Sequence, residues 1–143
     1  MISLDIGHNN LGSEGGNLIA RALYRNTTLI SLKINSNQLE SRKLIAGVLY
    51  DNTTLIFLNL DTNQLKDKRG KEIAITLCKN NTMTTLNLSN NGLNHKEVYI
   101  FTKALCKNTT LTALNLNNNI DIKERKKLKK AIKKYNNYIF MGL

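Results

Sequence analysis

The stretch CKNTTLTALNLNNN, residues 106–119, decides the fold because the chain repeats it. The earlier versions are CKNNTMTTLNLSNN from residue 78, YDNTTLIFLNLDTN from residue 50 and YRNTTLISLKINSN from residue 24. A phrase that recurs at a fixed interval of this length is the sequence signature of a stacked repeat array. The repeat therefore has to be interpreted before any single motif.

A row of anchor residues sets the register of the repeats. Successive anchors lie 28, 26, 28 and 28 residues apart, and they are Leu4, Leu32, Leu58, Leu86 and Leu114. Each copy follows the pattern L-x-x-L-x-L-x-x-N-x-L, in which Met or Ile replaces some leucines. In the fifth copy Asp121 stands at the position of the last consensus Leu. We therefore expect either a looser turn there, or that the side chain of Ile120 or Ile122 fills the space of the missing leucine.

Each copy combines a strand signal with a helix signal. The Leu-x-Leu alternation places two leucines on one face of a short strand. Apolar residues then recur at helical spacing; they are Leu44, Ile45, Val48 and Leu49 in the second copy and Ile73, Ala74 and Leu77 in the third. One such unit cannot bury its apolar face alone, so the units stack. We predict an α/β solenoid of about five and a half repeats.

These features resemble those of the leucine-rich-repeat family. The period of 26 to 28 residues, the Ile-Ala-x-x-Leu helix core and the Asn-Thr-Thr-Leu link are similar to the ribonuclease-inhibitor-like class. That class includes the repeat domains of NOD-like receptors and of the GTPase activator for Ran. The resemblance covers nearly the whole chain. It implies a horseshoe-shaped arc with a parallel sheet on the concave face, helices on the convex face and a protein partner, although the repeats are a scaffold for different functions.

Two columns of asparagine follow the repeat. We predict that the consensus column forms a buried amide ladder, because an amide offers both donor and acceptor to the turning backbone; its members are Asn9, Asn37, Asn63, Asn91 and Asn119. The second column opens each Asn-x-Thr link just after a helix, where we expect asparagine to take the left-handed conformation that ends a helix. Its members are Asn26, Asn52, Asn80 and Asn108.

The C-terminal segment continues the pattern. Leu128, Ala131, Ile132 and Tyr135 extend a helical stripe, and Met141 takes the anchor position of a partial sixth repeat. We therefore predict one leucine-rich-repeat domain over residues 1–143, with six strands and five helices. Neither end shows an obvious polar cap, which predicts either self-association through an end or a longer array.

Composition limits the setting of the protein. No run of 18 apolar residues predicts a membrane span, and the first residues lack the features of a signal peptide. Cys78 and Cys106 occupy one slot of neighbouring repeats, beyond the reach of a disulfide. We expect a cytoplasmic protein, or one delivered into a host cell. The net charge of +11 could attract an acidic protein, an anionic membrane or nucleic acid.

The sequence offers no set of residues suited to catalysis, a metal or a cofactor. His8 and His95 lie three repeats apart, too far to share a metal at about 5 Å per strand. Asp5 and Asp61 fall in different columns two strands apart, so a paired acid–base role is not expected. We therefore predict a non-enzymatic protein with no cofactor, no metal and no small-molecule substrate.

The concave face is predicted to be small, polar and nearly neutral, with Phe57 protruding from it as a binding anchor. A single exposed apolar residue without a role is the alternative. We expect Lys33 to act as a charge partner between Asp5 and Asp61. The residues predicted to bind a partner on this face are Lys33, Phe57, Asn59, Asp61, Asn87 and Asn115.

The run KERKKLKKAIKK, residues 123–134, predicts a basic amphipathic helix that carries +7 of the net charge. Its predicted basic patch comprises Lys123, Arg125, Lys126, Lys127, Lys129, Lys130, Lys133 and Lys134. One interpretation is a solvated helix that keeps this end of the protein soluble. The other is contact with an anionic membrane, nucleic acid or an acidic protein. A single Arg and no interleaved aromatics would make any nucleic-acid contact non-specific.

Three functional hypotheses follow. The first is a protein-binding module that engages a partner on its concave face, with a host-directed effector as one setting. The second is an anionic-surface binder, for membrane or nucleic acid, that acts through the basic helix. The third, regulation of a GTPase, rests on the family resemblance alone.

Overall fold

The computed structural model describes residues 2–40, 49–105, 107–119, 121–135 and 140–142. Six short strands form one parallel sheet in the order β1-β2-β3-β4-β5-β6. The strands are β1 (Ser3–Asp5), β2 (Ser31–Lys33), β3 (Phe57–Asn59), β4 (Thr85–Asn87), β5 (Ala113–Asn115) and β6 (Phe140–Gly142). This strictly sequential order is what a stack of similar units produces, because each strand pairs only with those of adjacent repeats.

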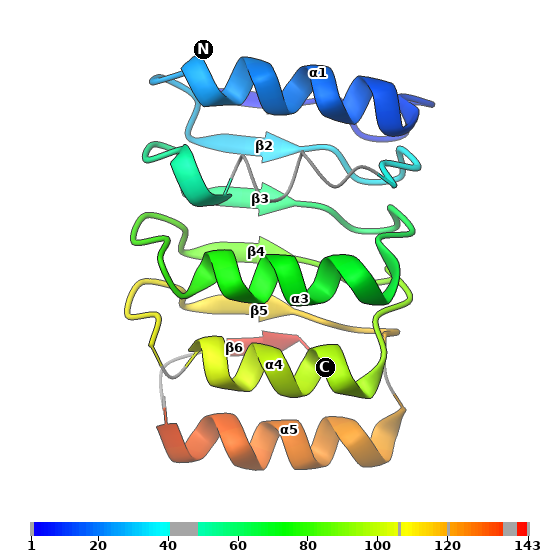
Figure 1. The fold of residues 1–143 in the computed structure, drawn as a ribbon, viewed down its shortest axis with the longest axis vertical. Coiled ribbons are helices and arrows are strands. Elements are labelled where there is room, and N and C mark those ends of the chain that lie inside the picture. The colour runs from blue at the N-terminus through cyan, green and yellow to red at the C-terminus, as the bar shows by residue number, and fades with distance from the viewer. Residues whose placement is uncertain (1, 41–48, 106, 120, 136–139, 143) are drawn as a thin grey trace.

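The connections between strands carry helices that stack on one side of the sheet (Figure 1). They are α1 (Gly12–Arg25), α3 (Lys66–Leu77), α4 (His95–Leu105) and α5 (Ile122–Tyr135). Residues 49–51 are also helical, whereas residues 44, 45 and 48 of the predicted stripe lie outside the described part of the chain. In α3 the predicted stripe is confirmed, since Ile73, Ala74 and Leu77 are fully buried.

The strand pairing confirms the predicted register. The anchor row runs through all six strands without a shift, from Leu4 to Met141. Inside the stack, Leu32, Leu58 and Leu86 are at most 1% exposed and pack in the core between sheet and helices. A shift of one residue would turn this whole row to solvent, so the buried leucines hold the register.

The consensus asparagines form the predicted buried ladder. Asn63 donates from Nδ2 to the carbonyl oxygens of Ile34 (2.9 Å) and Leu60 (3.1 Å), and its Oδ1 accepts the main-chain N–H of Asn37 (3.0 Å). Asn91 repeats these bonds one repeat further along. Each amide thus joins its own turn to the turn of the preceding repeat, which satisfies buried main-chain groups that water cannot reach.

The ladder is looser at the first repeat. Asn9 is exposed and donates only within its own repeat, to the carbonyl oxygens of Ile6 and Gly7 at 3.0 Å each. The Oδ1 of Asn37 is buried and has no hydrogen-bond partner among the described residues. The ladder amides therefore make fewer bonds between the first two repeats than between the second and the third.

The second asparagine column ends the helices in a different way from the prediction. Asn26 has φ −86° and ψ 123°, which is extended rather than left-handed, and the other three members are not left-handed either. The side chain caps the turn instead. Asn52 donates from Nδ2 to the Leu23 carbonyl of the preceding repeat (2.9 Å) and accepts the N–H of Leu55 (2.8 Å). This makes a second inter-repeat ladder, which corrects the expected backbone role.

One set of left-handed positions lies one residue before each ladder asparagine. They are His8, Ser36, Thr62, Asn90 and Asn118, with φ between 52° and 58°. At this point the chain leaves the strand and turns toward the helices. Different residue types fill this slot, and in the first four repeats the main-chain N–H at the slot donates to a carbonyl of the following repeat. For the β-branched Thr62 this conformation is unfavourable.

Asp121, which replaces the last consensus leucine, caps α5. Its Oδ1 accepts the N–H of Glu124 at 2.8 Å, and its carbonyl accepts the N–H of Arg125 at 3.0 Å. A carboxylate at this position also interacts favourably with the helix dipole. Residue 120 and the side chain of Ile122 lie outside the described part, so their expected substitution for the leucine stays a prediction.

Candidate functional site

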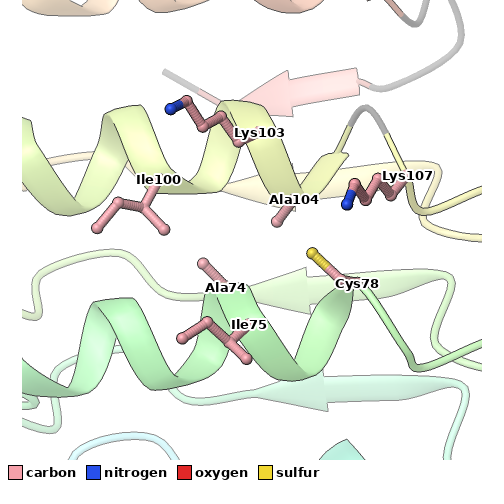
Figure 2. Close-up of a pocket in the computed structure, with 7 residues that line it drawn as sticks. All are labelled: Ala74, Ile75, Cys78, Ile100, Lys103, Ala104 and Lys107. Atoms are coloured by element: carbon pink, nitrogen blue, oxygen red, sulfur yellow. The ribbon is translucent and has the colours of Figure 1, made fainter.

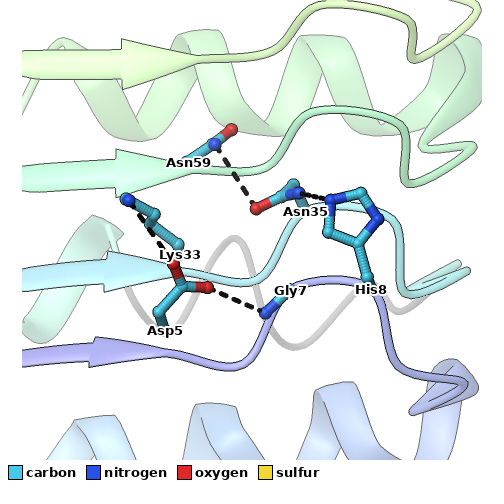
Figure 3. Close-up of polar contacts among 6 residues, drawn as sticks. All are labelled: Asp5, Gly7, His8, Lys33, Asn35 and Asn59. Atoms are coloured by element: carbon cyan, nitrogen blue, oxygen red, sulfur yellow. Dashed lines mark hydrogen bonds and ion pairs between the residues drawn. The ribbon is translucent and has the colours of Figure 1, made fainter.

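A network of polar side chains covers the exposed face of the sheet near its first strands (Figure 3). Lys33 Nζ lies 3.4 Å from Asp5 Oδ2, which is the predicted cross-strand pair. The Asn59 amide donates to Asn35 Oδ1 at 3.4 Å, and Asn35 bonds the Nε2 of His8 at 3.0 Å. The Lys33 and Asp5 side chains are about half exposed, so this pair orients the two charges more than it stabilises the fold.

The main chain of Gly7 shapes the surroundings of Asp5. Its N–H donates to Asp5 Oδ1 at 3.1 Å, and this bond, helped by Lys33, holds the pKa of the Asp5 carboxyl below its ordinary value. A Cβ at Gly7 would lie 2.6 Å from Asn35 Oδ1, so a larger residue would push the Asn35 amide away. Glycine is therefore required for the Asn35 side chain to lie across the neighbouring strand.

Asp61 belongs to a separate cluster further along the same face. Its Oδ1 accepts the Ser89 hydroxyl at 2.7 Å and the Asn90 amide at 2.8 Å. Among the described residues Lys33 forms an ion pair with Asp5 but none with Asp61, so it does not bridge the two acids as we expected. The two carboxylates face different partners and do not meet in one site.

The amides of the predicted binding set serve the turns after the strands. The Oδ1 atoms of Asn59, Asn87 and Asn115 each accept the N–H two residues along, at 3.0 Å. All three side chains are half-buried. Their oxygens are thus committed to local structure, and the amide nitrogens of Asn87 and Asn115 make no hydrogen bond within the described residues.

Phe57 sits in the middle of the sheet and is half-buried rather than fully protruding. An apolar row that the sequence reasoning missed runs beside it. We define the isoleucine row as Ile2, Ile30 and Ile56, which are 66%, 38% and 40% exposed. Ile30 donates its N–H to Ile2 O, and Ile56 donates to Ile30 O, both at 2.8 Å, so the three residues stack in register at the start of the strands.

The isoleucine row could have been found by following the residue before each strand through all repeats. In the first three repeats that residue is Ile, and in the next two it is Thr84 and Thr112. These threonines donate from Oγ1 to the carbonyls of Ile56 (3.4 Å) and Thr84 (3.2 Å). The row therefore changes from apolar to polar along the solenoid, and its apolar part ends next to Phe57.

The predicted basic patch is exposed on α5. Lys123, Lys126, Lys129 and Lys130 are exposed, whereas Arg125 is half-buried. Lys127 forms an ion pair with Glu124 at 2.8 Å, which raises its pKa above the ordinary value. The side chains of residues 133 and 134 lie outside the described part of the chain. Leu128 of the predicted stripe is buried, whereas the side chains of Ala131, Ile132 and Tyr135 lie outside the described part of the chain.

Charge is segregated between the two sides of the molecule. The outward side of the strands and the turns directly after them carry Asp5, Lys33 and Asp61, for a net charge of −1. Because the whole chain carries +11, the remainder carries +12. The outward side of the sheet and its turns therefore offer a polyanion little electrostatic attraction.

The described residues hold no group of three or more His, Cys, Asp or Glu side chains that could bind a metal ion. His8 is exposed, and the side chain of His95 is not described. Cys78 is half-buried with a free thiol, and Cys106 lies outside the described residues. Within that same part of the chain, no helix has the length and apolar character needed to span a bilayer.

The family comparison agrees with the geometry. A family model described as "Leucine Rich repeat" matches residues 1–20 and 79–95. The chain folds as a leucine-rich-repeat solenoid. No curated protein matches the sequence.

Several solved structures share this fold, including two from named proteins. One is "Leiomodin-1 Actin-Binding Site 2 (ABS2)", with a TM-score of 0.74 and 23% identity, covering 90% of this solenoid and 76% of that chain. The other is the tropomodulin C-terminal domain from Caenorhabditis elegans, with a TM-score of 0.76 and 12% identity. The match covers 96% of this chain and 85% of that chain. At these identities the likeness concerns the fold, and the exposed surfaces have to be interpreted from this chain's own residues.

Proposed function

We propose that this solenoid is a non-enzymatic protein-binding module whose partner docks on the concave face. The observation that supports it most is the isoleucine row beside Phe57: four apolar side chains in adjacent repeats, next to the polar network of Asp5 and Lys33. An apolar centre with a polar rim is the usual composition of a protein interface. The predicted contact residues Asn59, Asp61, Asn87 and Asn115 lie along the same face, toward the later repeats.

The partner of this face should bury the apolar centre first. Phe57 is the first residue of β3, and Ile30 and Ile56 directly precede the paired strands β2 and β3, so a partner segment that runs along the start of the strands would pass all three. The amides nearby have their oxygens engaged in turns, which leaves mainly donors for the partner. A partner segment with exposed carbonyl or carboxylate oxygens would match both features.

A site-specific cross-linking experiment tests this proposal. A photoreactive phenylalanine analogue at position 57 should capture a partner from the native cell, and the same analogue at Leu18, which is 58% exposed on α1, should not. With the partner purified, Phe57→Ala or Ile56→Ser should weaken binding by about 1–2 kcal/mol. Leu18→Ser is the matched apolar control. Equal capture from both positions, or equal losses from both surfaces, would contradict concave-face docking.

The structural neighbours suggest specific partners to test within this proposal. The leiomodin neighbour is an actin-binding site by name, so co-sedimentation with filaments and binding to monomeric actin are direct first assays. Family resemblance adds three finer points to the proposal. They are membership of the ribonuclease-inhibitor-like subclass, regulation of a GTPase, and a role as an effector in a host cell. A cytoplasmic location and self-association through the ends of the stack also belong to it.

A second candidate function rests on α5. Four exposed lysines on α5, Lys123, Lys126, Lys129 and Lys130, together with the exposed, ion-paired Lys127, form a cationic surface that suits an anionic membrane or nucleic acid. The charge segregation favours this contact on the convex side. It is compatible with the first function, because the two surfaces lie on different sides of the stack.

A further inference from the structure

An apolar groove lies between α3 and α4, on the helical side of the solenoid (Figure 2). Its volume is about 440 Å³, within the range of about 300–1,000 Å³ that is typical of binding sites. Its walls are Ala74, Ile75 and Cys78 from α3 and its C-terminal end, and Ile100 and Ala104 from α4. Figure 2 shows the Cys78 thiol directed into the space between the two helices.

The preceding junction holds a tyrosine where this one holds Cys78. Tyr50 occupies the slot of Cys78 one repeat earlier, and Lys79 occupies the slot of Lys107. The Nζ of Lys79 lies 4.8 Å from the centre of the Tyr50 ring and 3.3 Å from its hydroxyl. Both lysines make the same main-chain hydrogen bond at the helix end, at 3.0 Å, so their backbones are equivalent. The ring, which is 53% exposed, and the ammonium form a cation–π pair at the surface of this junction.

At the junction of α3 and α4 the ring is missing. Cys78 is much smaller than tyrosine, so the space stays open and becomes the groove. Lys107 keeps its position at the rim, but it has no acidic or aromatic partner among the described residues. Lys103, also at the rim, lies over the ring of Tyr99 on its own helix at 5.1 Å. The groove is therefore an apolar slot with two exposed cations beside it.

We propose that this groove binds a helix of a partner protein that presents one aromatic anchor flanked by acidic side chains. The anchor would take the place that Tyr50 takes at the preceding junction and would meet Lys107 face-on. The acidic side chains would pair with Lys103 and Lys107. A helix fits because the groove runs between two side-by-side helices, where the side-chain ridges of a third can lie. A second copy of this chain, with a net charge of +11, lacks the required acidity.

The test starts from an unbiased helical peptide display library selected against the folded protein. The expected peptides combine one Trp, Tyr or Phe with Asp or Glu three or four residues away. Cys78→Tyr, which introduces the residue used by the preceding junction, should close the groove and weaken their binding at least about tenfold. Cys78→Ser, which keeps the groove open, is the matched control and should bind like the unmodified protein. Thermal unfolding confirms that both variants are folded.

Charge reversal gives an independent measurement that does not depend on filling the groove. Lys103→Glu with Lys107→Glu should weaken the selected peptides at least about tenfold, and peptides with Lys in place of their acids should regain affinity for this variant. Lys96→Glu, an exposed cation of α4 that does not line the groove, should leave binding unchanged. Selection of no acidic aromatic peptides, or of peptides insensitive to both changes, would overturn the proposal. Binding of phosphatidylglycerol vesicles that Cys78→Tyr abolishes would assign the groove to a membrane and overturn it as well.

Discussion

The side-chain oxygen of Asn91 accepts the main-chain N–H of Asn63 at 3.0 Å, across 28 residues of sequence. The same oxygen lies 3.4 Å from the N–H of Leu65. Each ladder asparagine therefore holds the turn of the repeat before it, and the conformation of one repeat depends on the next. This dependence makes the inner ladder asparagines structural residues, whereas Asn87 and Asn115 on the outer face of the sheet use their oxygens within their own turns.

Replacing one inner ladder asparagine should destabilise the protein strongly. Asn63→Ala removes the donor to Ile34 and Leu60 and the acceptor for Asn37, all buried, and should lower the free energy of unfolding by about 1–3 kcal/mol or more. Asn59→Ala, four residues earlier on the exposed face, should cost about 1 kcal/mol or less. Urea unfolding of both variants provides the measurement, and equal losses would be inconsistent with the ladder.

The second ladder predicts a sharper contrast between neighbouring residues. Asn80 is 8% exposed, donates to the Leu49 carbonyl at 2.8 Å and accepts the N–H of Met83 at 2.8 Å. Asn80→Ala should therefore lower the free energy of unfolding by about 1–3 kcal/mol. Asn81, the next residue, is exposed, and Asn81→Ala should change the free energy of unfolding by about 0.5 kcal/mol or less. Thermal unfolding of the two variants side by side checks this, and a smaller loss for Asn80 would contradict the bridging role.

Relief of backbone strain at Thr62 should stabilise the fold. Thr62 is exposed with φ 55°, a conformation that disfavours a β-branched residue, and the same slot holds asparagine at Asn90 and Asn118. Thr62→Asn should raise the free energy of unfolding by about 0.5–1 kcal/mol. The reverse change, Asn90→Thr, should lower it, with an added loss from the broken bond to Asp61. A Thr62→Asn variant no more stable than the original would show that the turn relaxes around threonine.

Asp5 should titrate below its ordinary range. Its folded pKa is depressed, first by the Gly7 N–H and then by Lys33, so its stabilising effect exists above the unfolded pKa. That effect is lost as the pH falls through the folded pKa, which places the loss in the acid range below about 4. Carboxyl NMR shifts should report a low midpoint. Lys33→Gln should raise this midpoint only in part, because the Gly7 bond remains; a return to the ordinary value would assign the shift to Lys33.

Salt should distinguish the two candidate functions. If α5 binds polyanions, association of the unmodified protein with anionic vesicles or RNA should fall steeply as salt rises, because bound counterions are released. Lys126→Gln, Lys129→Gln and Lys130→Gln together should remove this association without lowering the unfolding temperature, since all three side chains are exposed. The same variant should keep its concave-face partner. Absence of salt-sensitive binding to either polyanion would exclude the α5 function.

Much of the fold follows from the sequence because the repeat is a local rule applied several times. The anchor spacing predicted the pairing of every strand, and the consensus column predicted the ladder through Asn63 and Asn91. The conformation at Asn26 was predicted wrongly, because a side chain that caps a turn and a backbone that turns left-handed favour the same residue type. The exposure of Phe57 was overestimated, since the residue is half-buried in register with Ser31 and Thr85 of the neighbouring strands.

By itself, the sequence determined the stacking order, the register and the direction of the apolar face, since a buried row at a fixed period leaves one solution. Only the tertiary structure decided the surfaces, because they join residues from different repeats. Ile30 and Ile56 become a row through strand pairing, and Tyr50 meets Lys79 through helix stacking. At Cys78 that contact is lost and a groove opens, which depends on how far a side chain reaches across a junction rather than on the repeat pattern.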